Sequence, residues 1–152
     1  MMELVIDADR QRSVFADSCD WSEEIHMCLG WLEGGDPQGP SWDQLEPHLS
    51  KLRVAVVGLT SMRSDPYLLR RVYDQGTLRL VTSTEGGFSP NTYVFVRGNR
   101  VRALVASAPF SATSYEQSVE ALVLFEGERD EPMALQALDL LQRCRDLAHV
   151  PT

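Results

Sequence analysis

A strand, a helix and a second strand follow one another in the middle of the sequence, and this pattern limits the possible folds more than any other feature. Residues 54–57 (VAVV) form a short, continuous apolar run, which is typical of a strand buried on both faces. Asp65 and Pro66 predict the start of a helix, Gly76 predicts its end, and residues 77–82 predict the next strand. Because such a crossover is right-handed and joins two parallel strands, we expect a sheet that is at least partly parallel.

The residues before this unit supply further strands and helices. We predict a strand at residues 4–6, a helix at 8–19, a strand at 25–32 and a surface loop at 34–40. The loop sequence GGDPQGP suits neither a helix nor a central strand. After the loop, Ser41 and Gln44 match a capping box, which predicts a helix start. Pro47 either kinks this helix or marks the start of its regular part.

The second half of the chain predicts a β-hairpin, a last strand and a long helix. Residues 92–96 and 100–106 are β-rich and flank Gly98 and Asn99, a pair that favours a tight hairpin turn. The last elements are a strand at residues 119–125 and an amphipathic helix at residues 132–148. The elements together predict one α/β domain over residues 1–152, with a mixed sheet of about seven strands sandwiched between helices.

Charge and cysteine content argue against several classes of protein. Fourteen basic and 22 acidic side chains give a net charge of −8, so no overall field attracts nucleic acid or anionic lipid, and we expect neither as a partner. No apolar stretch approaches a membrane span and residues 1–12 are too polar for a signal peptide, which predicts a cytoplasmic protein. Three cysteines without a CxxC spacing argue against a disulfide framework. His26 and Cys28, with only His48 nearby, are too few for a metal site, and no metal or cofactor is expected.

Three blocks in the second half of the sequence resemble the active-site half of the phospholipase D-like nucleases. The blocks are FSPNTYVF at residues 88–95, RALVASAP at residues 102–109 and SVEALV at residues 118–123. In that family they usually read F-H-P-K-x-Y-x-F, A-L-V-G-S-x-N and N-x-E-A. The most similar group is the bacterial single-motif nucleases, which include metal-independent restriction enzymes. The order of elements elsewhere in the chain is compatible with the same fold.

The resemblance implies a defined chemistry. In the family, a histidine attacks phosphorus and forms a phosphohistidine, while lysine and asparagine side chains neutralise the charge on the phosphoryl oxygens. A second histidine, from a second copy of the motif, protonates the leaving oxygen, and no metal is needed. Single-motif members dimerise to bring two motifs together, so the resemblance also implies a homodimer.

The departures from the family pattern fall on the residues that carry out this chemistry. The substituted positions are Ser89 for histidine, Asn91 for lysine, Ala106 for glycine and Pro109 for asparagine, whereas Ser107 and Glu120 keep the family's residue types. Losing the histidine removes the covalent step, and losing a charge-stabilising donor typically costs about 10²–10³ in rate. The resemblance therefore implies a non-catalytic member with a vestigial site formed by Ser89, Asn91, Ser107 and Glu120.

Two of these residues allow alternatives. Ser89 could replace the histidine as nucleophile only with a base beside it, and His26 is the candidate if its strand lies in the same sheet. Otherwise Ser89 is a polar residue at a strand entry. Glu120 either accepts hydrogen bonds from a hydroxyl such as that of Ser107 or from backbone N–H groups, or belongs to a remaining polar pocket that binds a small ligand.

Three functions follow from these features. The leading hypothesis is a dimerisation or scaffold subunit that pairs with itself or with another protein, and the family's setting suggests a bacterial restriction or defence complex. The alternative is a metal-independent phosphodiesterase or nuclease with substituted residues. A third is a nucleic-acid or nucleotide module that contacts phosphate, or a partner, through Arg97, Arg100 and Arg102 around the hairpin turn; these arginines are otherwise solvated turn charges.

Overall fold

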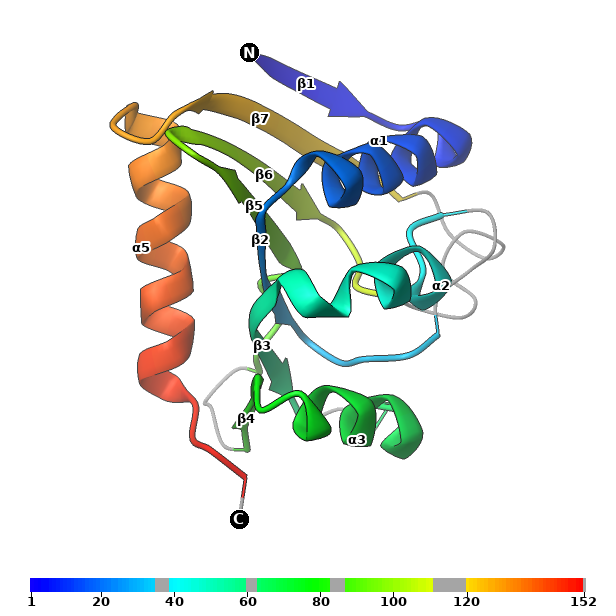
Figure 1. The fold of residues 1–152 in the computed structure, drawn as a ribbon. Helices are drawn as coiled ribbons and strands as arrows, with labels where there is room; N and C mark the ends of the chain where they lie inside the picture. Colours follow the sequence, from blue (N-terminus) through cyan, green and yellow to red (C-terminus); the bar gives the residue numbers. More distant parts are fainter. Residues whose placement is uncertain (35–38, 60–62, 83–86, 111–119, 152) are drawn as a thin grey trace.

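The chain forms one mixed sheet with helices on both faces (Figure 1). The structure is a computed structural model that describes residues 1–34, 39–59, 63–82, 87–110 and 120–151. Seven strands lie in the order β1-β7-β6-β5-β2-β3-β4. The predicted α/β class and the strand number are therefore confirmed.

Most element boundaries agree with the sequence pattern to within a few residues. The strands are β1 (Met2–Val5), β2 (Glu24–Leu29), β3 (Leu52–Gly58), β4 (Leu78–Val81), β5 (Thr92–Arg97), β6 (Arg100–Ala106) and β7 (Leu122–Glu128). The helices are α1 (Ala8–Trp21), α2 (Trp42–Leu45), the 3-10 helix η1 (Glu46–Lys51), α3 (Pro66–Asp74) and α5 (Pro132–Leu147). The strand predicted at 25–32 ends earlier, at Leu29, and residue 119 of the last predicted strand lies outside the described residues.

The strand pairings confirm the crossover unit and the hairpin. β2, β3 and β4 pair in parallel, as the pattern around residues 54–82 predicts. The pairs β2–β5, β5–β6, β6–β7 and β1–β7 are antiparallel. Arg97 pairs with Arg100 across the turn, where Gly98 has φ +53°, a conformation open to glycine at little cost.

The helix predicted after the loop is shorter and less regular than its apolar spacing suggests. Ser41 and Gln44 do form the capping box, but the α-helix ends at Leu45 and a 3-10 helix continues it. Pro47 lies near the start of that 3-10 segment, where its missing N–H costs no helical hydrogen bond. His48 has non-helical φ and ψ values, which marks the kink.

Two hydrophobic layers hold the helices to the sheet. Helices α1, α2 and α3 cover one face and α5 covers the other (Figure 1). Because side chains alternate along a strand, β5 sends Tyr93 and Phe95 toward the first layer and Val94 and Val96 toward α5. No helix in the described residues is long and apolar enough to cross a membrane.

An aromatic cluster fixes α1 on the sheet. The Asp7 side chain caps this helix by accepting from the backbone N–H of Asp9 at 2.9 Å. Phe15 then packs edge-on against Tyr93, at 5.2 Å between ring centroids, and against Phe110 at 5.3 Å. Phe110 is fully buried, so the segment that follows β6 is held in the core.

Two glycines allow backbone segments to approach closely at one end of the sheet. A Cβ added at Gly58 would lie 2.8 Å from the carbonyl oxygen of Gly30 and 3.1 Å from a ring carbon of Phe88. A Cβ added at Gly30 would lie 3.0 Å from the carbonyl oxygen of Phe88. The segment that leads into β5 therefore lies directly against the ends of β2 and β3.

Replacing Gly58 by alanine tests this close approach. Because the nearest atom is a backbone oxygen, which cannot move as a side chain can, we expect Gly58→Ala to lower the free energy of unfolding by about 1–3 kcal/mol. Urea denaturation measures this quantity. Gly34→Ala is the control, since an added Cβ there meets no atom within 4 Å in the part of the chain that the structure describes. Equal stability of the two variants would contradict the close packing.

Candidate functional site

The positions of the family motif gather at one end of the sheet. Thr92 at the start of β5 pairs with Val105 near the end of β6, and Ala106 pairs with Leu122 at the start of β7. The residues just beyond these strand ends therefore lie side by side. Cys28 of β2 also pairs with Thr92, which brings Gly30 to the same end.

The side-chain amide of Asn91 joins this end of the sheet to β2. Its Oδ1 accepts from the backbone N–H of Gly30 at 3.1 Å, and its Nδ2 donates to the Ser89 hydroxyl at 3.2 Å. The Asn91 carbonyl accepts from the backbone N–H of Ala106 at 2.9 Å. Asn91 is 3% exposed and has φ +42°, a left-handed conformation that asparagine adopts more readily than most residues. Asn91 thus links its own segment to Gly30 through its side chain and to Ala106 through its backbone carbonyl.

Ser107 and Glu120 form a second hydrogen-bonded pair. The Ser107 hydroxyl donates to the Glu120 carboxylate and accepts from the backbone N–H of Ala121 at 3.0 Å. The Ser107 backbone N–H donates to the Ala121 carbonyl at 2.9 Å, which extends the β6–β7 pairing by one residue. Fully buried Gln11 donates to the backbone carbonyl of Glu120 at 3.0 Å. The contact between the Ser107 hydroxyl and the Glu120 carboxylate is the one expected if Glu120 accepts a hydrogen bond from a hydroxyl.

The four residues of the predicted site therefore lie at one end of three adjacent strands, in two hydrogen-bonded pairs. Pro109, at the family's asparagine position, is buried next to Phe110. Three cavities in the described part of the chain lie elsewhere: between α5 and the sheet, between α3 and β4, and between α1 and β7.

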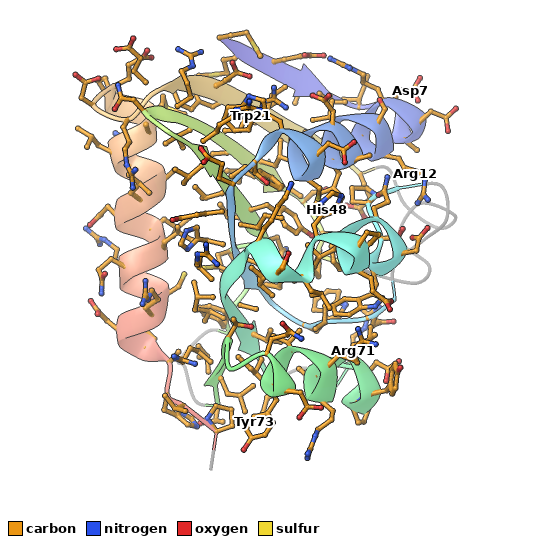
Figure 2. All side chains as sticks on the ribbon, in the orientation of Figure 1. Asp7, Arg12, Trp21, His48, Arg71 and Tyr73 are labelled. Atoms are coloured by element: carbon orange, nitrogen blue, oxygen red, sulfur yellow. The ribbon has the colours of Figure 1, made fainter. Side chains whose placement is uncertain are left out.

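The histidines are distant from Ser89. His26 lies on β2, the strand adjacent to β5, but it pairs with Val94, about 10 Å along the strand from Asn91. Its Nε2 lies 3.4 Å from Glu24, and burial lowers the pKa of His26 more than Glu24 raises it. His48 pairs with Asp20 at 3.2 Å on the α1 side of the sheet (Figure 2).

His149 is the third histidine of the chain, and its backbone forms a β-bridge with Leu80 of β4. Since β4 is the last strand at the far side of the sheet from β7, this residue is also remote from the motif positions. The structure thus supplies no imidazole base for Ser89 among the chain's three histidines.

The three arginines of the hairpin lie toward the opposite end of β5. Arg97 and its partner Arg100 are about 20 Å from Asn91 along the strand, and Arg102, which pairs with Phe95, is about 13 Å away. Arg97 donates to the Trp21 carbonyl at 3.1 Å, and Arg100 pairs with Glu126 at 3.1 Å. Arg102 pairs with Glu126 at 2.7 Å and stacks 4.4 Å from the Trp21 ring centroid, at the C-terminal end of α1 (Figure 2). Arg97, Arg100 and Arg102 therefore do not share a site with Ser89.

The environment of Glu126 shows how strongly these charges are paired. Burial by itself raises the pKa of Glu126, but hydrogen bonds from Arg102 and Arg100 outweigh it and hold the pKa below its usual value. Arg102 also pairs with Asp17 at 2.8 Å. Most of the positive charge of Arg100 and Arg102 is thus directed at carboxylates of the chain itself.

The three thiols are buried, and the acidic residues that the structure describes form no metal-binding cluster. Cys19, Cys28 and Cys144 are buried and reduced, and burial raises the pKa of Cys19 to about 12. Within the described ranges, no group of three or more histidine, cysteine, aspartate or glutamate side chains could hold a metal ion.

With this geometry, the fold is that of the phospholipase D-like proteins. The chain is similar to Nuc, a phospholipase D family member from Salmonella typhimurium, with a TM-score of 0.68, 11% identity, and 98% of this chain and 97% of that chain covered. It is also similar to NucT from Helicobacter pylori, with a TM-score of 0.64, 11% identity and 99% of each chain covered.

A third similar structure is TrmBL2, an archaeal chromatin protein described as showing a novel mode of DNA binding. The TM-score is 0.52 at 8% identity, and the match covers 99% of this chain and 55% of that chain. Neither family models nor curated protein sequences give a match. The comparisons therefore show the fold that the sequence motifs predicted.

Asn91→Ala tests the structural role of the amide. The substitution leaves the buried N–H of Gly30 without its acceptor, so we expect a loss of about 1–3 kcal/mol in the free energy of unfolding. Ser89→Ala removes an exposed hydroxyl and should change stability by less than about 0.5 kcal/mol. Urea denaturation of both variants decides the point, and an Asn91→Ala variant as stable as Ser89→Ala would contradict the bridge.

The lowered pKa of His26 predicts a pH dependence of stability. Between the folded pKa and the ordinary value of 6.5, the unfolded chain binds more protons than the folded chain, so stability rises with pH. The contribution of His26 is complete above pH 6.5 and declines as the pH falls below that value. Urea denaturation between pH 7.5 and 5.5, which are about one unit either side of the ordinary histidine pKa, should show a smaller pH slope for His26→Asn than for His48→Asn. Equal slopes would contradict the assignment.

Proposed function

We propose that this chain is a non-catalytic phospholipase D-like domain that acts by pairing with protein, either a second copy of itself or another subunit. One observation carries the proposal: the residue at the family's lysine position is Asn91, and its amide is engaged by Gly30 and Ser89. An amide is neutral, so Asn91 cannot neutralise the charge of a phosphoryl group as the ammonium group of a lysine would. It stabilises the fold instead.

The chemistry around Ser89 supports the same proposal. A serine hydroxyl attacks phosphorus only when a base removes its proton, and each histidine of the chain lies elsewhere in the fold. The Ser89 hydroxyl accepts from Asn91, a group that donates and cannot take up the proton. The Ser107 hydroxyl donates to the Glu120 carboxylate, but Ser107 stands at a position that does not carry the nucleophile in the family pattern.

Pairing with protein is the role that the family resemblance leaves once catalysis is removed. Single-motif phospholipase D-like proteins resemble half-sites that work as pairs, and a chain with a degenerate motif can retain a pairing surface after its chemistry is lost. By analogy with that setting, we propose a bacterial restriction or defence complex as the context. The similar chromatin protein, described by its DNA binding, is an example of the fold in a binding role.

Nucleic acid is a weaker candidate partner. The net charge of −8 opposes approach to a phosphate backbone, and Arg100 and Arg102 are already paired with Glu126. A phosphate would have to compete with these intramolecular carboxylates.

An assay with bis(p-nitrophenyl) phosphate in the presence of a chelator tests the absence of catalysis. We expect no hydrolysis above the buffer rate, because the chain offers neither an imidazole nucleophile nor a lysine at the motif positions. Ser89→Ala should give the same rate as the unmodified chain. Chelator-resistant hydrolysis that disappears in Ser89→Ala would overturn the proposal and favour the alternative, a metal-independent phosphodiesterase.

A further inference from the structure

β1 has one edge without a partner strand. The strand pairs with β7 and is the last of the seven in the sheet, at its outer margin in Figure 1. Helix α1 follows it directly and packs over the face of the sheet, which leaves the edge uncovered in the described part of the chain (Figure 1). Exposed strand edges are templates for pairing with another strand.

The hydrogen bonds to β7 show which backbone groups face this edge. The Met1 ammonium donates to the Glu126 carbonyl and the Glu126 N–H donates to the Met1 carbonyl, each at 2.9 Å, so the two residues occupy a hydrogen-bonded position of the antiparallel ladder. Such pairs alternate with pairs whose N–H and C=O groups point to the other side. Met2 and Leu4, opposite Phe125 and Val123, are of the second kind and direct their backbone groups to the free edge.

The side chains of the same residues are apolar and exposed. Met2 is 60% exposed and Leu4 and Ile6 are each 68% exposed, which is high for side chains of this size. Across the sheet, Leu4 lies beside Val123 and then Val105, which is 46% exposed, on the face that α5 covers only in part. These two valines also line an apolar groove of about 170 Å³ between the sheet and α5.

We propose that β1 pairs with β1 of a second copy of this chain, antiparallel about a two-fold axis at Leu4. An antiparallel pair of identical strands is self-complementary, as a two-fold dimer requires. In this register Leu4 faces Leu4 of the second copy, and Met2 faces Ile6. Every outward backbone group of Met2 and Leu4 then gains a hydrogen-bond partner. The apolar side chains of Val105, Val123 and Leu4, which lie side by side across the sheet, continue into Leu4 of the second copy.

Charge selects this register over the neighbouring one. A shift that placed Met2 opposite Leu4 would also place Glu3 opposite Glu3, and like charges directly opposite one another destabilise a sheet. In the proposed register Glu3 faces Val5. Glu3 also pairs with Arg10 of its own chain at 3.2 Å, but both side chains are exposed, so this pair offsets the charge of Glu3 only in part.

This inference rests on the proposed pairing function and names one surface and one partner for it. Because the two β1 strands run antiparallel, the two motif ends lie at opposite ends of the joined sheet, so this surface differs from the one through which the family resemblance implies that two motifs meet. Light scattering after size-exclusion chromatography tests it with the full chain and two matched variants. Leu4→Lys places a charge at the two-fold axis, whereas Leu147→Lys makes the same change at the end of α5, where the leucine is 59% exposed. We expect the mass of two chains for the unmodified protein and for Leu147→Lys, and the mass of one chain for Leu4→Lys.

The outcomes separate this inference from the proposed function. A dimer that persists in Leu4→Lys would overturn the β1 edge and leave pairing through another surface in place. If the unmodified protein and Leu4→Lys are both monomers at every concentration, pairing through the β1 edge is also excluded. The proposal that the chain is non-catalytic is judged separately, by the phosphodiester assay.

Cross-linking gives a second measurement that does not depend on a charged variant. In the proposed register Leu4 faces its own copy, whereas Ile6 and its copy are about 13 Å apart along the strands. A short bismaleimide should therefore join Leu4→Cys chains into covalent dimers and leave Ile6→Cys chains unlinked, although both positions are equally exposed. The native cysteines are buried, and the unmodified chain measures the background of cross-linking through them. Equal linkage of the two variants would contradict the register.

Discussion

The hydrogen bond from the Gly30 backbone to the side chain of Asn91 determines how one end of this sheet is built. It ties the segment before β5 to the end of β2, and it depends on glycine at residues 30 and 58, where the backbones come too close for a Cβ. Asn91 can make this bond because it is buried and accepts a positive φ. A lysine there would offer no acceptor for the Gly30 N–H, which would lose this hydrogen bond. The substitution therefore changes both the chemistry and the packing of this end of the sheet.

The hydrogen bonding at this end of the sheet extends to the neighbouring strands. Ser107 and Glu120, which keep the family's residue types, bond to each other and to the backbone of β7. Pro109 and Phe110 fill the core where the family has an asparagine, and Phe110 packs against the ring of Phe15. Asn91, Ser107 and Glu120 therefore make hydrogen bonds to the backbone or to one another that support the local fold. This is why we regard the domain as one that is used for its surfaces.

The sequence was sufficient to predict the fold, because its signals are local or periodic. The Gly98 turn, the apolar run of β3 and the Asp65 cap each act within a few residues, and all are found where expected. The motif resemblance placed Ser89, Asn91, Ser107 and Glu120 together. It could not reveal the roles of Gly30, Gly58 or Gln11, because their contacts join segments far apart in the chain. The separation of the three arginines from Ser89 and the exposed edge of β1 likewise depend on strand order, which spacing along the sequence does not encode.

The most direct test of the account is a nuclear magnetic resonance titration with orthovanadate, a mimic of the phosphoryl group in its transition state. The resonances to follow are the backbone amide of Gly30 and the side-chain amide of Asn91, since a phosphoryl group bound at the former site would have to displace or polarise their hydrogen bond. The account predicts that neither resonance moves as vanadate is added. Saturable shifts at both positions would show that this end of the sheet still binds a phosphoryl group, and would contradict it.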